Sequence, residues 1–276
     1  MRFRTEIGRI GRSFSISHDD RIVLTGSCFA DNIGERLAQS GFQAIHNPLG
    51  PLFNPASIAR VIRRGEVPYS ATDFTTGPDG TLHCLDFANR YQAGSADELA
   101  AKVNADYMPL ARAITEADVI IVTFGNDKVY EYSGTVAGNC HKLAASTFAE
   151  RYLGLDEICG LWRCLIPKGK RVIFTLSPVR YTGDGLARSC LSKATLRVAI
   201  DRICREGGYD YFPAYEIVND DLRDYRFYAE DLKHPSDMAV DYIYEKFAET
   251  YFTKDTISKA DEYRRAALRS AHIPLL

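Results

Sequence analysis

Residues 21–30 read Arg-Ile-Val-Leu-Thr-Gly-Ser-Cys-Phe-Ala, in which a β-branched run passes through a glycine into a helical pattern. The run 21–25 is short and apolar, which predicts a buried strand. From Cys28 onward, apolar residues recur every fourth position between residues 29 and 37, and this spacing predicts a helix that Gly41 terminates. A strand, a tight turn and a helix in this order form the first half of a βαβ unit.

The alternation of strand and helix continues along the chain. Further strands are predicted at residues 42–45, 119–124, 171–176 and 209–212. Further helices are predicted after the N-cap Asn54, from the capping-box residue Ser95 to Glu116, over residues 146–165 and 192–205, and from Pro235 through Tyr251. These lengths predict an α/β fold, a three-layer αβα sandwich whose mainly parallel sheet has helices on both faces. Residues 66–94 are rich in Thr, Gly, Asp and aromatic residues and are predicted to form a small β insertion.

The domain organisation predicted from the sequence is simple. The chain has 276 residues, a length compatible with one large domain, and it shows no internal repeat and no low-complexity linker. We therefore predict a single α/β domain over residues 1–252, followed by a helical tail over residues 253–276.

Composition and charge argue against several classes of protein. Hydrophobic residues make up 46% of the chain and charged residues 25%, which are ordinary globular proportions. The 34 Lys and Arg residues stand against 36 Asp and Glu residues, so the net charge of −2 gives no reason to expect a nucleic acid or a membrane as partner. The seven cysteines include no Cys-x-x-Cys pair, which argues against a disulfide framework or a cysteine-rich zinc site. The N-terminus has no apolar signal segment, so we expect a cytoplasmic protein. We also expect no metal or other cofactor.

Several chemically capable residues directly follow predicted strands. Ligands of parallel α/β sheets bind beyond the carboxyl ends of the strands, so these residues are expected to meet. Ser27 and Cys28 stand where a helix begins, and the free N–H groups and partial positive charge of that helix end favour a nucleophilic alkoxide or thiolate and a developing oxyanion. Gly50 and Asn126, which follow two further strands, are candidate oxyanion donors.

A late Asp-Leu-Lys-His segment adds a candidate general base. Asp231 and His234 are three residues apart, so a tight turn can present both to one point, with the carboxylate fixing the tautomer of the imidazole. Arg180 also follows a predicted strand and is a candidate for binding an anionic substrate group or an acid in the core. Asn139 and His141 are expected to line the substrate site.

The order of nucleophile, glycine, asparagine and late Asp-x-x-His resembles that of the SGNH, or GDSL-like, hydrolases. The segment 26–30 spells Gly-Ser-Cys-Phe-Ala, the name of the GSCFA family, and the chain resembles that family more closely over about residues 20–252. Further similar stretches lie at residues 47–50, 139–142, 177–180 and 223–228. The resemblance implies an SGNH hydrolase-like or flavodoxin-like fold. It also implies that Gly50 and Asn126 donate to the oxyanion and that Asp231 and His234 complete a triad.

Two assignments of the nucleophile remain open. An ungapped match of the SGNH motif Gly-Asp-Ser onto residues 26–28 places Cys28 at the nucleophile position, whereas a shift by one residue places Ser27 there. We favour Cys28, because a helix N-terminus and His234 are expected to lower the pKa of a thiol.

The leading functional hypothesis is an acyl hydrolase, of the esterase or deacetylase type, that acts on a small-molecule or glycan ester or on a thioester. An acyltransferase of the same fold and a non-catalytic small-molecule or glycan-binding domain are alternatives. A metallohydrolase with His141 and Asp127 as ligands is a further alternative, although their spacing matches no known ligand pattern. The aromatic-rich residues 66–94 and the Tyr-rich residues 209–228 are candidates for lining the pocket.

Overall fold

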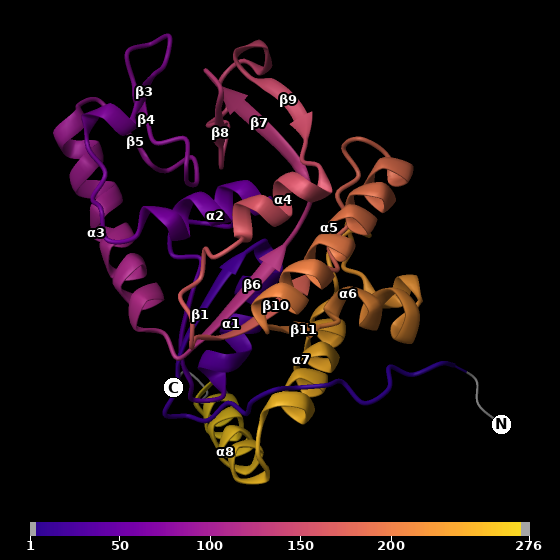
Figure 1. The fold of residues 1–276 in the computed structure, drawn as a ribbon. Helices are drawn as coiled ribbons and strands as arrows, with labels where there is room; N and C mark the ends of the chain where they lie inside the picture. Colours follow the sequence, from indigo (N-terminus) through magenta and orange to yellow (C-terminus); the bar gives the residue numbers. More distant parts are fainter. Residues whose placement is uncertain (1–3, 272–276) are drawn as a thin grey trace.

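A five-stranded parallel sheet crosses the centre of the computed structural model, which describes residues 4–271 (Figure 1). The strands stand in the order β11-β10-β6-β1-β2. Their bounds are β1 Arg21–Gly26, β2 Gln43–His46, β6 Val119–Phe124, β10 Arg171–Leu176 and β11 Asp210–Phe212. The chain moves from β1 to the edge strand β2 and then crosses to β6 on the other side of β1. That reversal of direction is a topological switch point, where parallel sheets commonly bind ligands.

Helices cover both faces of this sheet, because alternate residues of each strand point to opposite sides. Val23 and Ile120 face one helical layer, whereas Ile22 and Ile121 face the other. The first layer consists of α2 Pro55–Arg64, α3 Ala96–Glu116, α4 Leu155–Trp162 and α5 Leu186–Gly207. The second consists of α1 Cys28–Gln39, the short α6 Ala214–Glu216, α7 Asp237–Tyr251 and α8 Lys254–Ala271. The predicted three-layer αβα sandwich with a parallel sheet is confirmed.

Two small antiparallel sheets stand at the upper end of the molecule in Figure 1. One contains β3 Thr75–Thr76, β4 Leu82–His83 and β5 Gln92–Ala93, and it is the predicted insertion at residues 66–94. The other contains β7 Lys128–Tyr132, β8 Thr135–Ala137 and β9 Ala149–Tyr152. This second sheet was not predicted from the sequence. The helix predicted over residues 146–165 is wrong in its first half. Residues 149–152 instead pair with β7, and the helix begins only at Leu155.

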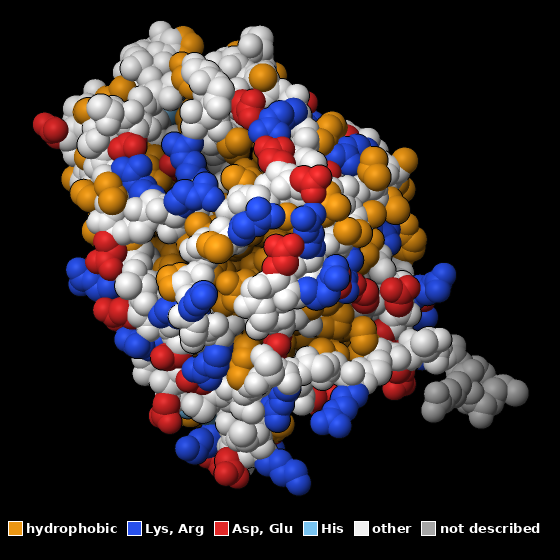
Figure 2. Space-filling model, viewed as in Figure 1, with side chains coloured by type: hydrophobic (Ala, Val, Ile, Leu, Met, Phe, Trp, Pro, Cys, Tyr) orange, Lys and Arg blue, Asp and Glu red, His pale blue; other side chains and the backbone are white. Residues whose placement is uncertain are grey.

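Residues 1–3 and 272–276, which belong to the predicted domain and the predicted tail, lie outside the described residues. Within residues 4–271, every helix is too short or too polar to cross a lipid bilayer. On the face shown in Figure 2, Lys and Arg side chains are interspersed with Asp and Glu side chains, and neither sign covers a large continuous area.

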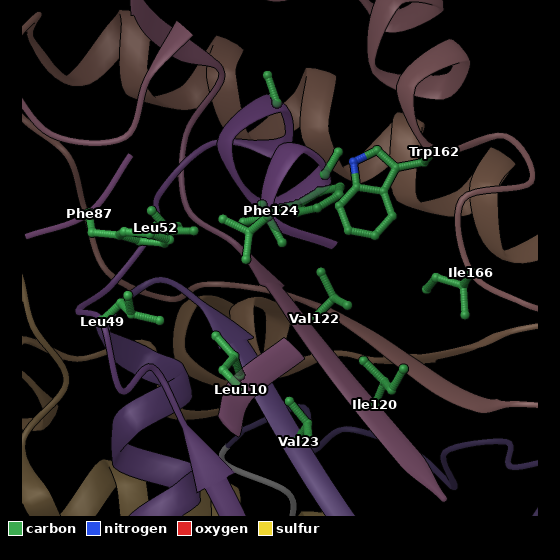
Figure 3. Packing of buried hydrophobic residues seen from close by; sticks show 14 of the residues in the cluster. Val23, Leu49, Leu52, Phe87, Leu110, Ile120, Val122, Phe124, Trp162 and Ile166 are labelled. Carbon is green, nitrogen blue, oxygen red and sulfur yellow. The ribbon is translucent and has the colours of Figure 1, made fainter. Parts of the chain in front are cut away.

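Aromatic packing supports the end of β6 from which the candidate oxyanion loop leaves. Phe124 is fully buried, with its ring centroid 5.1 Å from that of Trp162 and 5.7 Å from that of Phe174. Figure 3 shows Phe124 and Trp162 within the same cluster of buried side chains. The strand end is therefore held rigidly against α4.

We expect replacement of Phe124 by alanine to lower the free energy of unfolding by about 3–5 kcal/mol, because it removes buried apolar contacts and leaves a cavity. Urea unfolding monitored by circular dichroism measures this change. Phe53→Ala is a suitable comparison, because Phe53 is 39% exposed and its loss is expected to cost far less. Equal losses in the two variants would contradict the packing argument.

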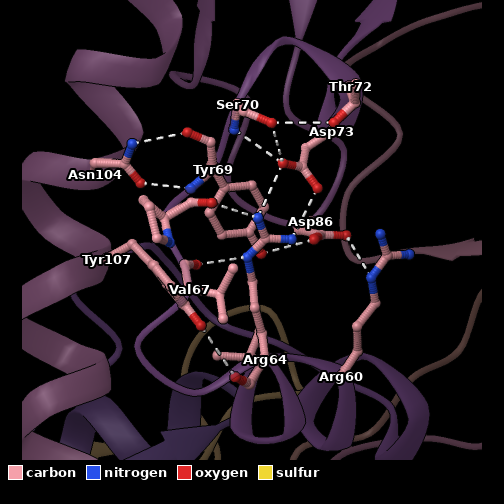
Figure 4. A network of polar contacts seen from close by, with 12 residues as sticks. Arg60, Arg64, Val67, Tyr69, Ser70, Thr72, Asp73, Asp86, Asn104 and Tyr107 are labelled. Carbon is pink, nitrogen blue, oxygen red and sulfur yellow. Dashed lines mark hydrogen bonds and ion pairs between the residues drawn. The ribbon is translucent and has the colours of Figure 1, made fainter.

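A buried polar network fastens the β insertion to α2 (Figure 4). Arg64 of α2 binds the Asp73 carboxylate at 2.8 Å, and its guanidinium lies 3.7 Å from the centre of the Tyr69 ring. The Tyr69 hydroxyl donates to Asp86 at 2.7 Å, and Arg60 of α2 lies 3.4 Å from the same carboxylate. Burial raises the pKa of Asp86 despite these cations. The network positions the backbone of the insertion, and the insertion in turn supports a cavity wall through the Leu85 carbonyl oxygen, which accepts from the Gly138 N–H.

Candidate active site

A cavity of about 870 Å³ opens beyond the carboxyl ends of β1, β6 and β10. Residues that follow each of these strands contribute to its wall: Ser27 and Cys28 after β1, Asn126 after β6, and Ser177 after β10. The antiparallel sheet β7–β9 supplies further lining residues, which the sequence analysis did not anticipate. The volume lies within the range of about 300–1,000 Å³ that is common for small-molecule sites.

The turn between β1 and α1 requires glycine at position 26. Gly26 has φ +136°, and a Cβ atom built on it would lie 2.1 Å from the carbonyl oxygen of Thr123. The close approach allows the Ser27 N–H to donate to that same oxygen at 3.1 Å. The turn therefore places the first residues of α1 tightly beside the end of β6.

Ser27 and Cys28 both line the cavity, but their side chains have different surroundings. Ser27 is 1% exposed, and its hydroxyl caps α1 by accepting from the N–H of Phe29 at 3.4 Å. Cys28 is the first residue of α1, and it is half-buried with a free thiol. The serine oxygen therefore has a structural role as a helix cap, whereas the cysteine sulfur forms no disulfide.

The electrostatics of Cys28 differ from the sequence-based expectation of a lowered thiol pKa. Burial raises the pKa of this thiol, and the Asp31 carboxylate raises it further. The N–H groups of Cys28 and Phe29 and the charge of Lys193 act in the opposite direction but do not reverse the shift. The thiol is therefore protonated at neutral pH, and a reaction at its sulfur requires a base.

His234 lines the same cavity, in a turn that holds its imidazole in one orientation. The Nδ1 atom lies 2.6 Å from a carboxylate oxygen of Asp231, whose other oxygen accepts from the N–H groups of Lys233 and His234 at 2.9 and 3.0 Å. These hydrogen bonds hold the pKa of Asp231 far below its usual range. An ionised carboxylate only accepts, so Nδ1 carries a proton, and the lone pair of the neutral imidazole is on Nε2. The imidazole is thus prepared to act as a base.

Asn126 contributes an amide group to the cavity wall. Its loop is held by the carbonyl oxygen of Phe53, which accepts from the N–H groups of Gly125 and Asn126 at 2.8 and 3.0 Å. No other residue of the described chain forms a hydrogen bond with the Asn126 carboxamide, which is only half-buried. The carboxamide is therefore available to donate to a ligand.

The structure does not bring Gly50 to the cavity. Its N–H donates to the carbonyl oxygen of Asn47 at 2.8 Å within a turn, and its Cα packs against Ala88 of the insertion. A donor that is engaged in a turn cannot also bind an oxyanion. The N–H of Cys28, for which no acceptor is found among the described residues, is better placed for that role.

Two of the three residues expected to bind substrate, Asn139 and Arg180, line the cavity. His141, by contrast, is buried behind the wall, where Nε2 lies 2.9 Å from the carbonyl oxygen of Phe87 and Nδ1 lies 3.2 Å from Nδ1 of His83. Burial lowers the pKa of His141. The backbone N–H of His141 donates to Asn139 Oδ1 at 2.9 Å, so His141 helps to position a lining residue rather than to contact a ligand.

The two candidate metal ligands, Asp127 and His141, have different neighbours. Asp127 forms an ion pair with Arg188 at 2.6 Å, whereas His141 contacts Phe87 and His83. Over residues 4–271, no group of three or more His, Cys, Asp or Glu side chains is arranged to hold a metal ion. The segments 66–94 and 209–228 are also absent from the described lining. The insertion instead supports the wall from behind, since the Gly138 N–H donates to the carbonyl oxygen of Leu85 at 2.8 Å.

Lys193 of α5 is a residue that the sequence analysis missed. It is 4% exposed, and its amine donates to the carbonyl oxygens of Gly125 and Ser177, both at 2.7 Å. It therefore ties together the two loops that follow β6 and β10. Burial lowers its pKa to about 7. The available signal was a lysine three residues before Leu196, on the apolar face of a predicted helix.

Lys193 is expected to make the free energy of unfolding depend on pH. Its pKa is about 7 in the folded protein, below the ordinary 10.5, so the unfolded chain binds more protons between these values. This residue therefore makes the free energy of unfolding rise with pH across that window. We expect the difference in unfolding free energy between the wild type and Lys193→Met, measured in urea, to grow in favour of the wild type from pH 7 to about pH 10.

Comparing each variant with the wild type cancels the contributions of the cysteines and tyrosines that both proteins share. Lys246→Met is the control, because Glu249 raises the pKa of Lys246 and the expected trend is opposite. A wild-type minus Lys193→Met difference that stays flat over this range would contradict the expectation.

Comparison with known proteins adds one family assignment. The model of the GSCFA family matches residues 21–247. No curated protein matches the chain. Among solved structures, the chain is similar to the crystal structure of a carbohydrate esterase family 3 from Talaromyces cellulolyticus, with 9% sequence identity, a TM-score of 0.38, and coverage of 87% of this chain and 98% of that chain. The family match spans all five strands of the central sheet and includes both Cys28 and His234.

Proposed function

This chain belongs to the GSCFA family, and on that premise, together with the geometry of the cavity, we propose that it is an acyl hydrolase that cleaves an ester or thioester through Cys28, His234 and Asp231. The observation that carries the proposal is the lining of one cavity by a free thiol at a helix start and by an imidazole whose Nδ1 is held by a carboxylate. Nucleophile, base and orienting group are the three parts that acyl transfer through a covalent intermediate requires.

The proposed reaction begins with proton transfer from the Cys28 thiol to Nε2 of His234. The sulfur forms a bond to the acyl carbon, and the carbonyl electrons move to the oxygen. When this tetrahedral intermediate collapses, the bond to the leaving alkoxide or thiolate breaks, and the leaving group takes the proton from the imidazolium. Water then attacks the thioester with His234 again as base, which releases the carboxylic acid and restores the thiol.

Stabilisation of the intermediate is assigned to two groups near the nucleophile. The free carboxamide of Asn126 and the N–H of Cys28 belong to residues that line the cavity, and both lack an acceptor among the described residues. The Asp231 carboxylate stabilises the positive charge of the imidazolium during the reaction, because it already lies 2.6 Å from Nδ1.

Trapping of the covalent intermediate tests this proposal. The protein is incubated with p-nitrophenyl acetate, quenched in acid, digested and examined by mass spectrometry. We expect acetyl on the peptide that contains Cys28, and we expect this acetylation to be lost in His234→Asn. Cys164 and Cys190 are internal controls, because both are exposed and free and report only background chemical reactivity.

The same experiment separates the alternatives. Release of acetate to water indicates a hydrolase, whereas transfer of the acetyl group to an added alcohol indicates an acyltransferase. A protein that forms no adduct at Cys28 and releases no nitrophenol above background is not an acyl hydrolase, and a non-catalytic binding domain would then account for the cavity.

A further inference from the structure

The wall of the active-site cavity is uneven in charge. Its lining includes the cationic side chains of Lys128, Arg180 and Lys233, whereas no Asp or Glu of the described residues contributes to it. The face of the molecule shown in Figure 2, by contrast, mixes both signs. A cleft lined by charges of one sign concentrates ligands of the opposite sign.

One of the three cations is neutralised within the protein. The Lys128 amine lies 2.8 Å from Asp184 and 2.9 Å from Glu150. Its charge therefore has two compensating carboxylates, and it offers a ligand little net attraction.

Arg180 and Lys233 have no such compensation. Within residues 4–271, no carboxylate forms an ion pair with either side chain. The N–H of Arg180 donates to the carbonyl oxygen of Lys233 at 3.0 Å, which fixes the two residues side by side. The Arg180 guanidinium lies 4.5 Å from the centre of the Tyr228 ring and 3.3 Å from the Tyr225 hydroxyl. These aromatic contacts orient the guanidinium without neutralising it.

The acid closest in sequence does not cancel this charge. The Asp231 carboxylate accepts from the Nδ1 atom of His234 and from two backbone N–H groups, and it makes no ion pair with Lys233 among the described contacts. Lys233 directly precedes His234, so the two free cations stand beside the proposed general base. A ligand bound by them would have its reactive bond close to the imidazole.

We propose that the substrate carries an anionic oxygen group, a carboxylate or a phosphate, and that Arg180 and Lys233 bind this group. This inference rests on the proposed function, because it places the anion on the molecule whose acyl bond is cleaved. The planar fork of an arginine matches two oxygens of a carboxylate or phosphate, and the lysine adds a mobile point charge. The cavity of about 870 Å³ accommodates both the anionic group and the acyl bond.

Matched pairs of esters test the inference and locate the anion. p-Nitrophenyl hydrogen succinate and p-nitrophenyl butyrate differ by a carboxylate on the acyl part. Acetylglycerol phosphate and acetylglycerol differ by a phosphate on the alcohol part. We expect kcat/KM of the wild type to favour the anionic member of at least one pair by about tenfold or more.

The preference is expected to depend on the two cations. Arg180→Gln and Lys233→Gln should each reduce the ratio of anionic to neutral kcat/KM several-fold, and the double variant should bring it close to one. Raising the salt concentration from about 0.05 M to 0.5 M should also reduce the ratio, because half-exposed charges are screened. Arg226→Gln is the matched control, since Arg226 is exposed, pairs with Asp224 and does not line the cavity.

The outcomes distinguish this inference from the proposed function. If the wild type hydrolyses the neutral esters and shows no preference for either anionic ester, the inference is overturned and the function stands. If no ester is hydrolysed, the proposed function fails, and binding of succinate or glycerol phosphate measured by calorimetry decides the inference instead. Binding that Arg180→Gln weakens would support an anion site, and the absence of binding would reject it.

Discussion

Replacing Cys28 by alanine is expected to lower kcat/KM for ester hydrolysis by about a thousandfold or more and to leave the fold intact. The sulfur is the only atom that the variant removes from the cavity, and the neighbouring Ser27 hydroxyl is engaged in capping α1. The thermal midpoint should change little, because the side chain is small and only half-buried. Initial rates with p-nitrophenyl acetate and circular dichroism measure the two effects.

Ser27→Ala is the matched control for this prediction, because it changes the neighbouring residue in the same turn. Its hydroxyl caps α1, so its loss is expected to cost about 1 kcal/mol of stability and only a small part of the activity. The reverse pattern, an active Cys28→Ala and an inactive Ser27→Ala, would make Ser27 the nucleophile and would refute the assignment made here. Cys28→Ser is expected to retain less activity than the wild type, because a hydroxyl is a weaker nucleophile.

Replacing His234 by asparagine is expected to lower kcat/KM near neutral pH by about a hundredfold to ten-thousandfold. The loss should be large because burial and Asp31 raise the pKa of the Cys28 thiol, so little thiolate exists without a base. Asparagine retains a polar group of similar size and is expected to leave the stability nearly unchanged at this exposed position. Steady-state kinetics of the purified variant provide the measurement.

The pH profile of the His234→Asn variant provides a second readout. Below the thiol pKa, the thiolate fraction rises tenfold per pH unit, so the residual rate should rise by about a hundredfold from pH 6 to pH 8. The rate of a Cys28→Ala, His234→Asn double variant should not follow that slope beyond the background hydrolysis of the ester. A residual rate independent of pH, or a His234→Asn variant with full activity, would exclude His234 as the base.

Much of the fold was predictable because local signals and global packing agree. The β-branched runs at 21–25, 119–124 and 171–176 are strands, since a buried strand needs an uninterrupted apolar sequence. The N-caps Asn54 and Ser95 mark the helix starts, because their side chains accept from the N–H three residues later. These features are encoded within a few residues and do not depend on the rest of the chain.

The errors occurred where long-range contacts override local pattern. Residues 149–152 are a strand because β7 offers them a pairing edge, and a helical spacing of apolar residues does not record that partner. The α5 helix begins at Leu186, earlier than predicted, because its first turn is mostly exposed and carries a weak apolar pattern. Gly50 lies in a turn whose own N–H bond to Asn47 excludes it from the cavity.

Some features of the candidate site were likewise predictable from local sequence, and others depend on long-range contacts. The Gly-Ser-Cys turn and the Asp-x-x-His turn are local motifs, so residue order alone indicates a nucleophile at a helix start and an imidazole oriented by a carboxylate. The sequence pattern indicates at most that Lys193 is buried; the hydrogen bonds that define the roles of Lys193 and His141 go to backbone carbonyls from other parts of the chain. The raised pKa of the Cys28 thiol belongs to this second group, since burial among several segments is its main cause.

For this protein, then, residue order specifies which elements form and which reactive groups stand at their ends, because periodicity, capping and tight turns act over short stretches of chain. Folding in three dimensions specifies which of those groups share a cavity, how each is protonated and which charges on its wall are left uncompensated. These properties depend on solvent exclusion and on distances between remote segments, and neither quantity exists until the sheet and its helical layers have assembled.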